Sequence, residues 1–285
     1  MSVEFERRVE SILDRLVVSS NRLSGGSVGE VYKVGLTDGQ FVVAKVDNQS
    51  APILELEGSM LTYLAQYSQL PVPQVLFCDS RLLVLEYLPG TSSFNSISQH
   101  HAAELLASLH NIGAESFGFG YDTLIGGLHQ PNPWNGSWID FFREQRLLFM
   151  GQQARDIGNL PDILFRRLRE FSEKLEKWLI EPAKPSLIHG DAWTGNILAL
   201  NDQIIGFLDP AIYFADAEIE LAFTTLFGTF GDSFFGRYEE IRPIEPGFLE
   251  ARLDIYNLYP LLVHVRLFGG SYVSSVERVL KRFGF

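Results

Sequence analysis

Three polar side chains with catalytic potential lie in the segment LIHGDAWTGNILAL, residues 187–200, which otherwise consists mainly of apolar and small residues. Asp191 follows His189 by two residues, and Asn196 follows Asp191 by five. Phosphoryl transfer needs an aspartate that orients the attacking hydroxyl and accepts its proton, together with an asparagine and a second aspartate that hold magnesium. Asp191 and Asn196 have the His-x-Asp-x-x-x-x-Asn spacing that serves this chemistry.

Other parts of the chain supply the remaining groups. Asp209 ends the strand-like run IIGFLD, where a metal-binding carboxylate would face the same cleft, and Lys45 closes the strand-like run FVVAK, from which it could contact a triphosphate. A helical pattern follows with two acids, Glu55 and Glu57. We predict that Glu57 pairs with Lys45, because position 57 shares the helix face of the apolar residues Leu54, Leu61, Leu64 and Ala65.

A glycine-rich segment, SGGSVGEV, precedes these residues. It matches the pattern Gly-x-Gly-x-x-Gly-x-Val at Gly26, Gly29 and Val31, with Ser24 where the first glycine would fall. Glycine has no Cβ, so backbone amides in such a loop can approach phosphate groups closely. We predict nucleotide contacts from four residues of this loop: Gly25, Gly26, Ser27 and Gly29.

Each of these features alone has an ordinary explanation. A glycine-rich turn between strands is usually only a turn, and Asp209 before Pro210 is a common turn opener. For His189 we favour a buried supporting role over a catalytic one. Lys45, considered alone, would be a solvent-exposed residue at the end of a strand. The order decides the interpretation, because loop, lysine, glutamate, connecting strand, base, asparagine and metal aspartate follow one another as a kinase fold requires.

The surrounding pattern predicts an α+β protein with a two-lobed, protein-kinase-like fold. Strand-like runs at 30–36, 40–46 and 81–88 flank a helix at 53–66, which predicts a small antiparallel sheet with one helix. Helical spacing follows at 99–110, 137–150, 162–179, 217–227 and 248–268, interrupted by a β-hairpin region at 186–208. We predict a nucleotide-binding lobe at 1–88 and a catalytic and substrate-binding lobe at 89–285.

The connector between these lobes carries three further predicted nucleotide contacts: Glu86, Tyr87 and Leu88.

Composition limits the partners and the compartment. The chain has 285 residues, 46% of them hydrophobic, and a formal net charge of −12, which argues against a nucleic acid as the main partner and favours cationic ligands. Cys78 is the one cysteine, so no intrachain disulfide can form, and the first residues are charged where a secretory signal would be apolar. We expect a cytoplasmic protein without membrane spans. The oligomeric state is left open.

Longer segments resemble the fructosamine 3-kinase, or ketosamine kinase, family, which belongs with the aminoglycoside and choline phosphotransferases in the protein-kinase-like fold. The resemblance covers essentially the whole chain. Its most specific segments are LASLHNIGAESFGFGYDTLIGGLHQPNPWNGSWIDFFREQRL, HGDAWTGN, LDPAIYFADAEIELAFTTLFG and LYPLLVHVRLFGGSY. The chain departs from the family pattern at four positions, which are Ala192, Glu220, Val263 and Arg266.

The resemblance implies ATP-dependent, magnesium-assisted phosphorylation of a sugar hydroxyl on a ketoamine, and hence deglycation of a small cationic ketoamine or a glycated protein. Such a substrate carries a protonated amine, which aromatic side chains can hold. We predict that Trp193 lines the acceptor site and consider the same role for Trp134, whereas core packing is an equal alternative for Trp134 and Trp138. An aminoglycoside or other small-molecule phosphotransferase and a nucleotide-binding pseudokinase scaffold remain as alternative functions.

Overall fold

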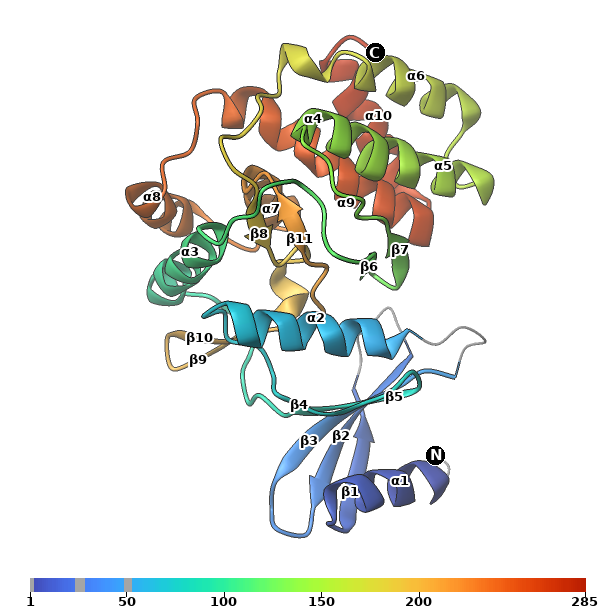
Figure 1. Ribbon diagram of the computed structural model, residues 1–285, viewed down its shortest axis with the longest axis vertical. Helices are drawn as coiled ribbons and strands as arrows, with labels where there is room; N and C mark the ends of the chain where they lie inside the picture. The colour runs from blue at the N-terminus through green and yellow to red at the C-terminus, as the bar shows by residue number, and fades with distance from the viewer. Residues whose placement is uncertain (1–2, 24–28, 49–52) are drawn as a thin grey trace.

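The computed structural model describes residues 3–23, 29–48 and 53–285, and its ribbon shows an antiparallel sheet at one end and a larger helical assembly at the other (Figure 1). Three of the predicted phosphate-loop residues, Gly25, Gly26 and Ser27, lie outside the described residues. Within them, no helix is long and apolar enough to cross a membrane.

The sheet has five strands in the order β1-β2-β3-β5-β4, with every neighbouring pair antiparallel. β2 and β3 form a hairpin across the predicted Thr37-Asp38-Gly39 turn, where Gly39 has a φ of 82° that glycine adopts without strain. Helix α1 packs on one face and helix α2 on the other (Figure 1). The bounds are α1 Val3–Leu13, β1 Val17–Arg22, β2 Glu30–Leu36, β3 Phe41–Val46, α2 Leu54–Tyr67, β4 Val75–Cys78 and β5 Leu82–Glu86.

The helical part surrounds one large apolar core. Trp138 lies inside it, fully buried, and its indole Nε1 donates to Tyr256 Oη at 2.9 Å, so core packing is the role this residue has. The helices are α3 Ser96–His110, α4 Trp138–Phe141, α5 Phe149–Asp156, α6 Asp162–Ser172, α7 Glu218–Leu226, α8 Asp232–Ile241, α9 Leu253–Phe268 and α10 Ser271–Arg282. π-helical turns at Phe142–Leu148 and Phe248–Arg252 lead into α5 and α9.

Three two-stranded ladders lie between the sheet and the helices. They are formed by β6 (Thr123–Ile125) with β7 (Leu128–Gln130), β8 (Ser186–Ile188) with β11 (Tyr213–Ala215), and β9 (Ile197–Leu200) with β10 (Gln203–Phe207). The predicted hairpin is therefore present only as β9 and β10. Strand β8 pairs instead with β11, which the prediction placed outside the β region, because this pairing joins segments that are distant in sequence.

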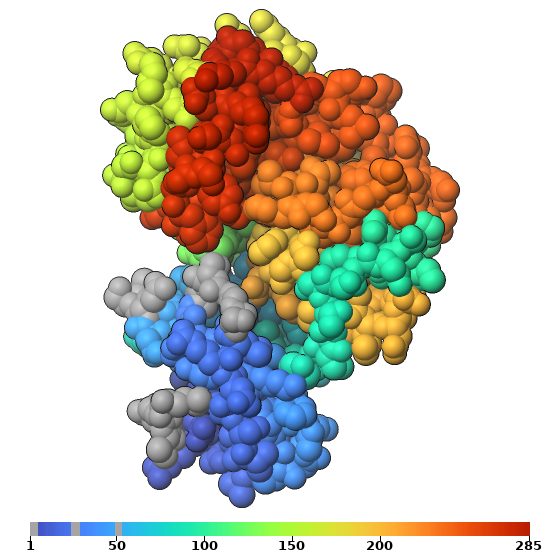
Figure 2. All heavy atoms as spheres, turned by 180° about the vertical axis from the view of Figure 1, so that it is seen from behind, coloured from blue at the N-terminus to red at the C-terminus, as the bar shows by residue number. Residues whose placement is uncertain are grey.

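The connector after β5 touches both parts of the molecule. Thr91 and Ala199 exchange backbone hydrogen bonds of 2.9 and 2.8 Å, and a Cβ at Gly206 would lie 2.3 Å from Leu88 Cδ1, so Leu88 packs directly against β10. In the view from behind, the residues after β5, in green, run along one side of the junction (Figure 2). The predicted α+β class is confirmed, while the boundary at residue 88 stays a prediction.

Candidate active site

The loop after β8 is shaped by a glycine that tolerates no side chain. Gly190 has a φ of 83°, and a Cβ there would lie 2.2 Å from the carbonyl oxygen of Ala211. The Ala211 amide donates to the carbonyl of His189 at 2.8 Å, which closes the contact. This close backbone approach brings the loop that carries Asp191 next to the segment that carries Asp209.

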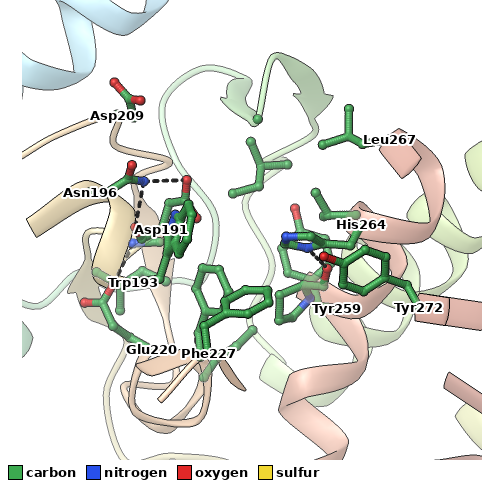
Figure 3. A pocket seen from close by; sticks show the side chains of 18 of the residues that line it. Asp191, Trp193, Asn196, Asp209, Glu220, Phe227, Tyr259, His264, Leu267 and Tyr272 are labelled. Carbon is green, nitrogen blue, oxygen red and sulfur yellow. Dashed lines mark hydrogen bonds between the residues drawn. The ribbon is translucent and has the colours of Figure 1, made fainter. Parts of the chain in front are cut away.

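Asp191 and Asn196 face each other across this loop (Figure 3). Asn196 Nδ2 donates to Asp191 Oδ2 at 2.8 Å and to the Asp191 carbonyl at 3.0 Å. A short 3₁₀ turn, Thr194–Asn196, makes the reach possible. The contact fixes one oxygen of the Asp191 carboxylate and leaves the other to face the cavity beside it.

The environment of Asp191 raises the affinity of its carboxylate for a proton. Burial raises the pKa of its carboxyl well above the ordinary value, and the negative charges of Asp209 and Glu220 raise the pKa further, against the opposing effect of the Asn196 hydrogen bond. A carboxylate with a raised pKa is a stronger base than an ordinary aspartate. Asp191 is therefore suited to accept a proton from a bound hydroxyl.

Lys45 lies opposite this loop, between two carboxylates. Its Nζ is 2.6 Å from Glu57 Oε1 and also contacts Asp209 Oδ1. Glu57 is buried and Glu55 is exposed, so the predicted choice of Glu57 as the partner is confirmed as a contact. Burial lowers the pKa of Lys45, but the charges of Asp209 and Glu57 outweigh burial and raise it above its ordinary value, so the lysine stays a cation.

Asp209 adopts a left-handed backbone conformation between β10 and β11, with φ of 51°, which aspartate tolerates better than most residues. Its side chain is 36% exposed. Because Asp191 engages the amide nitrogen of Asn196, the amide oxygen of Asn196 is the atom suited to a metal. An amide and a carboxylate oxygen fit Mg²⁺, which proteins hold through one or two such groups plus substrate phosphates.

Glu220 holds the loop after β8 through its backbone amides. From the sequence, this residue stood out only as a departure from the family pattern. Its carboxylate accepts hydrogen bonds from the backbone amides of His189 at 3.1 Å and Gly190 at 2.6 Å, and it lies 2.9 Å from His110 Nε2. Burial raises the pKa of Glu220, but the His110 hydrogen bond and the other contacts outweigh burial and lower it. The sequence did contain a signal for this role, which is an acidic residue within the mainly apolar run 217–224. A charge buried there needs partners.

The ring of His189 supports the same loop. It is fully buried, burial lowers its pKa, and its Nδ1 accepts the Asp191 amide at 3.3 Å. This contact to a backbone amide agrees with the supporting role that we predicted.

Two cavities meet at Asp191 and Asp209. The smaller one lies between Lys45, Glu57 and the β6–β7 turn. The larger one, of about 500 Å³, extends from Asp191 toward α9 and is lined in part by Trp193. Lys45, Asp191 and Asp209 thus lie where the two cavities meet, and Asn196 lines the larger one beside them. This arrangement can carry out phosphoryl transfer.

Not every predicted contact lines these cavities. Trp134 is 53% exposed, packs beside Phe214 and lines neither cavity, so the structure does not bring it to the site. Glu86, Tyr87 and Leu88 line neither cavity as well, and lie at the connector.

Gly29 is the one described residue of the predicted phosphate loop. Its φ is 67°, and a Cβ would lie 2.3 Å from the carbonyl oxygen of Val46, so the backbone there passes close to the end of β3, next to Lys45.

Known proteins share this architecture. The chain has 30% identity and a TM-score of 0.86 to a solved structure described as a "Putative fructosamine-3-kinase" from Haemophilus somnus, covering 99% of this chain and 97% of that one. A corresponding structure from Thermobifida fusca gives 32% identity, a TM-score of 0.85 and coverage of 97% and 98%. The aminoglycoside phosphotransferase APH(4)-Ia, at 15% identity and a TM-score of 0.70, shares the fold. The fold is that of a protein-kinase-like phosphotransferase.

Sequence comparison narrows this class. The model of the fructosamine kinase family matches residues 7–283. A protein named "Probable ketoamine kinase" from Vibrio parahaemolyticus is 34% identical over 268 residues, covering 92% of this chain and 91% of that one, and one of the same name from a Synechocystis strain is 34% identical over 270 residues, covering 91% and 88%. The chain belongs to the fructosamine kinase family and is a kinase.

Proposed function

We propose that this kinase transfers the γ-phosphoryl group of ATP to a sugar hydroxyl of a ketoamine, the rearranged adduct of a reducing sugar and an amine. The observation that carries the proposal is the position of Asp191, a carboxylate of raised pKa, where the Lys45 cavity joins the larger cavity. Family membership supports the ketoamine as the acceptor class.

On the nucleotide side, Lys45 would bind the phosphates, and its contact with Glu57 would fix the direction of its ammonium group. Gly25, Gly26, Ser27 and Gly29 would supply backbone amides to the phosphates, and Glu86, Tyr87 and Leu88 would hold the base of the nucleotide. Asn196 and Asp209 would hold Mg²⁺. When bound, this ion neutralises the charge that develops on the transferred group.

On the acceptor side, Asp191 would orient the sugar hydroxyl and accept its proton. The hydroxyl oxygen bonds to the γ-phosphorus, the bond from that phosphorus to the β–γ bridging oxygen breaks, and ADP leaves. Asn196 holds Asp191 Oδ2, so the hydroxyl would meet Oδ1. Glu220 keeps the loop in place through the amides of His189 and Gly190.

The ketoamine carries a protonated amine near the reacting sugar. Trp193 lines the larger cavity and offers an aromatic face to such a cation. The formal net charge of −12 adds a favourable field for a cationic substrate. Membership in the fructosamine kinase family supports a role in removing sugar adducts from amines.

A substrate panel tests the proposal. ADP formation is measured with fructosamine, ribulosamine and erythrulosamine derivatives beside a set of aminoglycosides, for the wild-type protein and for Asp191→Asn. We expect turnover of at least one ketoamine that depends on Asp191. Turnover of aminoglycosides alone would favour the related phosphotransferase function, and nucleotide binding without any turnover would favour a pseudokinase.

A further inference from the structure

The far wall of the larger cavity is uncharged and aromatic. We call it the aromatic arm and define it by six residues at the end of α7, along α9 and at the start of α10: Phe227, Val263, His264, Leu267, Phe268 and Tyr272. Figure 3 shows His264, Leu267 and Tyr272 across the cavity from Asp191, Asn196 and Asp209. The arm is therefore separate from the groups that handle the phosphoryl group.

The rings of the arm gather around His264. Its ring centroid is 4.8 Å from that of Tyr272, 5.0 Å from that of Phe227 and 5.7 Å from that of Phe268. Its Nδ1 lies 2.7 Å from the carbonyl oxygen of Pro260, which can only accept, so Nδ1 carries the proton. Burial lowers the pKa of His264, which keeps the imidazole neutral near pH 7.

The charges of the cavity lie at its other end. Among the described residues that line it, the carboxylates are Asp191, Asp209 and Glu220, and no lysine or arginine is present. Arg266 belongs to α9 but is not among the lining residues. A negatively charged group that entered the arm would therefore gain no lysine or arginine partner among the described lining residues.

The cavity also has room beyond a sugar. Its volume of about 500 Å³ lies within the range of about 300–1,000 Å³ that holds drug-sized ligands. With the sugar hydroxyl at Asp191, the amine of a ketoamine and its substituent would extend through the larger cavity toward α9.

We infer that the aromatic arm binds the substituent on the ketoamine nitrogen and selects an uncharged apolar or aromatic group. Ketoamines made from free α-amino acids, whose substituent carries a carboxylate, are disfavoured. This inference rests on the proposed function, since it takes the ketoamine as the acceptor, and it names the specificity-determining residues of that site.

Two ketoamines of the same sugar test it, one made from benzylamine and one from glycine. The value of kcat/KM is measured for each with saturating ATP, and the dissociation constant of each is measured by calorimetry, which does not require turnover. We expect the benzylamine adduct to be preferred by at least about tenfold in both measurements, because an unpaired charge is costly to bury. Equal values for the two compounds, or no binding of either, would overturn the inference.

A charge introduced into the arm should remove the preference. Leu267→Arg places a cation there, and we expect it to lower the ratio of benzylamine to glycine adduct by at least about tenfold. Leu249→Arg is the matched control, because Leu249 is 68% exposed and does not line the cavity, so the ratio should stay at its wild-type value. An unchanged ratio in a folded Leu267→Arg protein would contradict the assignment.

The proposed function can fail separately. If calorimetry gives the predicted preference but neither adduct is phosphorylated, the arm is correctly assigned and the reaction is not.

Discussion

Asp191 carries a charge that its surroundings oppose. Burial and the neighbouring carboxylates of Asp209 and Glu220 raise its pKa, and the Asn196 hydrogen bond offsets only part of this effect. A group whose pKa is higher in the folded protein than in the unfolded chain destabilises the fold once the pH exceeds the unfolded value. At the scale of single residues, catalysis and stability therefore make opposite demands on this position.

The first prediction follows from that opposition. Asp191→Asn should lower turnover by about 10²- to 10⁴-fold, the range for a lost general base, while raising the free energy of unfolding at pH 7. The gain over wild type should be absent below about pH 4, grow as the pH rises and level off above the raised pKa. Chemical denaturation across this pH range and steady-state kinetics check it. A variant that is active, or less stable than wild type at pH 7, would contradict this description of Asp191.

The second prediction compares two acids of α2. Glu57→Gln should weaken ATP use several-fold more than Glu55→Gln, because Glu57 holds the ammonium group of Lys45 and Glu55 is exposed to solvent. The KM for ATP and kcat are measured for both variants, with Glu55→Gln as the control. Equal losses in the two variants would show that the Lys45–Glu57 contact does not position the lysine for ATP.

At the scale of elements, a buried chain of hydrogen bonds joins three helices to the catalytic loop. Tyr238 of α8 lies 2.7 Å from His110 Nδ1, His110 of α3 contacts Glu220 of α7, and Glu220 holds the loop amides. Since an ionised Glu220 can only accept, His110 Nε2 carries the proton and Nδ1 accepts from the tyrosine. The loop is thus positioned in part by α3 and α8, which line neither cavity of the site.

The third prediction tests this chain. His110→Ala should lower kcat by at least tenfold and leave the affinity for ATP nearly unchanged. It should also lower the free energy of unfolding by on the order of 2–3 kcal/mol, because the buried Glu220 carboxylate loses its partner. His100→Ala is the control, because His100 is exposed on the same helix. Parallel loss of ATP affinity and kcat would indicate a general defect rather than a misplaced loop.

The elements also show what the sequence can and cannot predict. The strands at β2 and β3 and the face of Glu57 follow from local periodicity, and they were predicted correctly. Helix α1 was not predicted, because its segment VEFERRVE is rich in charge and buries only Val9 deeply among its described side chains. The partner of β8 was not predicted either, since a pairing across 25 residues leaves no local pattern.

The same distinction holds in the site. Asp191 and Asn196 were predicted from their spacing, and Lys45 and Asp209 from their order along the chain. The structure brings the four together, and their roles stay predictions. For the two tryptophans, the sequence predicted a place at the acceptor site for Trp193 and left Trp134 open between that place and core packing. Trp193 lies in the loop next to Asp191 and lines the cavity, whereas Trp134 lies against Phe214 at the surface, and only the chain path decides between these places.

At the scale of the whole molecule, the sheet and the helical part contribute opposite walls of one site. Lys45 from β3 contacts Asp209 from the helical part, so this ion pair joins the two. In the proposed reaction, Lys45 would turn to the phosphates and Asp209 to a metal ion. Nucleotide binding would then break the ion pair that joins the sheet to the helical part.

The fourth prediction concerns this junction. Asp209→Ala should abolish the magnesium dependence of ATP binding and cost little stability, because its side chain is partly exposed and contributes little packing. ATP is titrated with and without magnesium for both proteins, by calorimetry. Overlapping magnesium titrations of variant and wild type would remove Asp209 from the metal site.

The most direct test of the proposed reaction is identification of its product. Wild-type protein is incubated with a ketoamine, ATP and magnesium, and phosphorus NMR and mass spectrometry follow the product beside the Asp191→Asn variant. We predict one phosphate ester on a sugar hydroxyl for each ADP formed, and at least about a hundredfold less with the variant. ADP without a phosphorylated ketoamine, or the same product at the same rate from Asp191→Asn, would contradict the central claim.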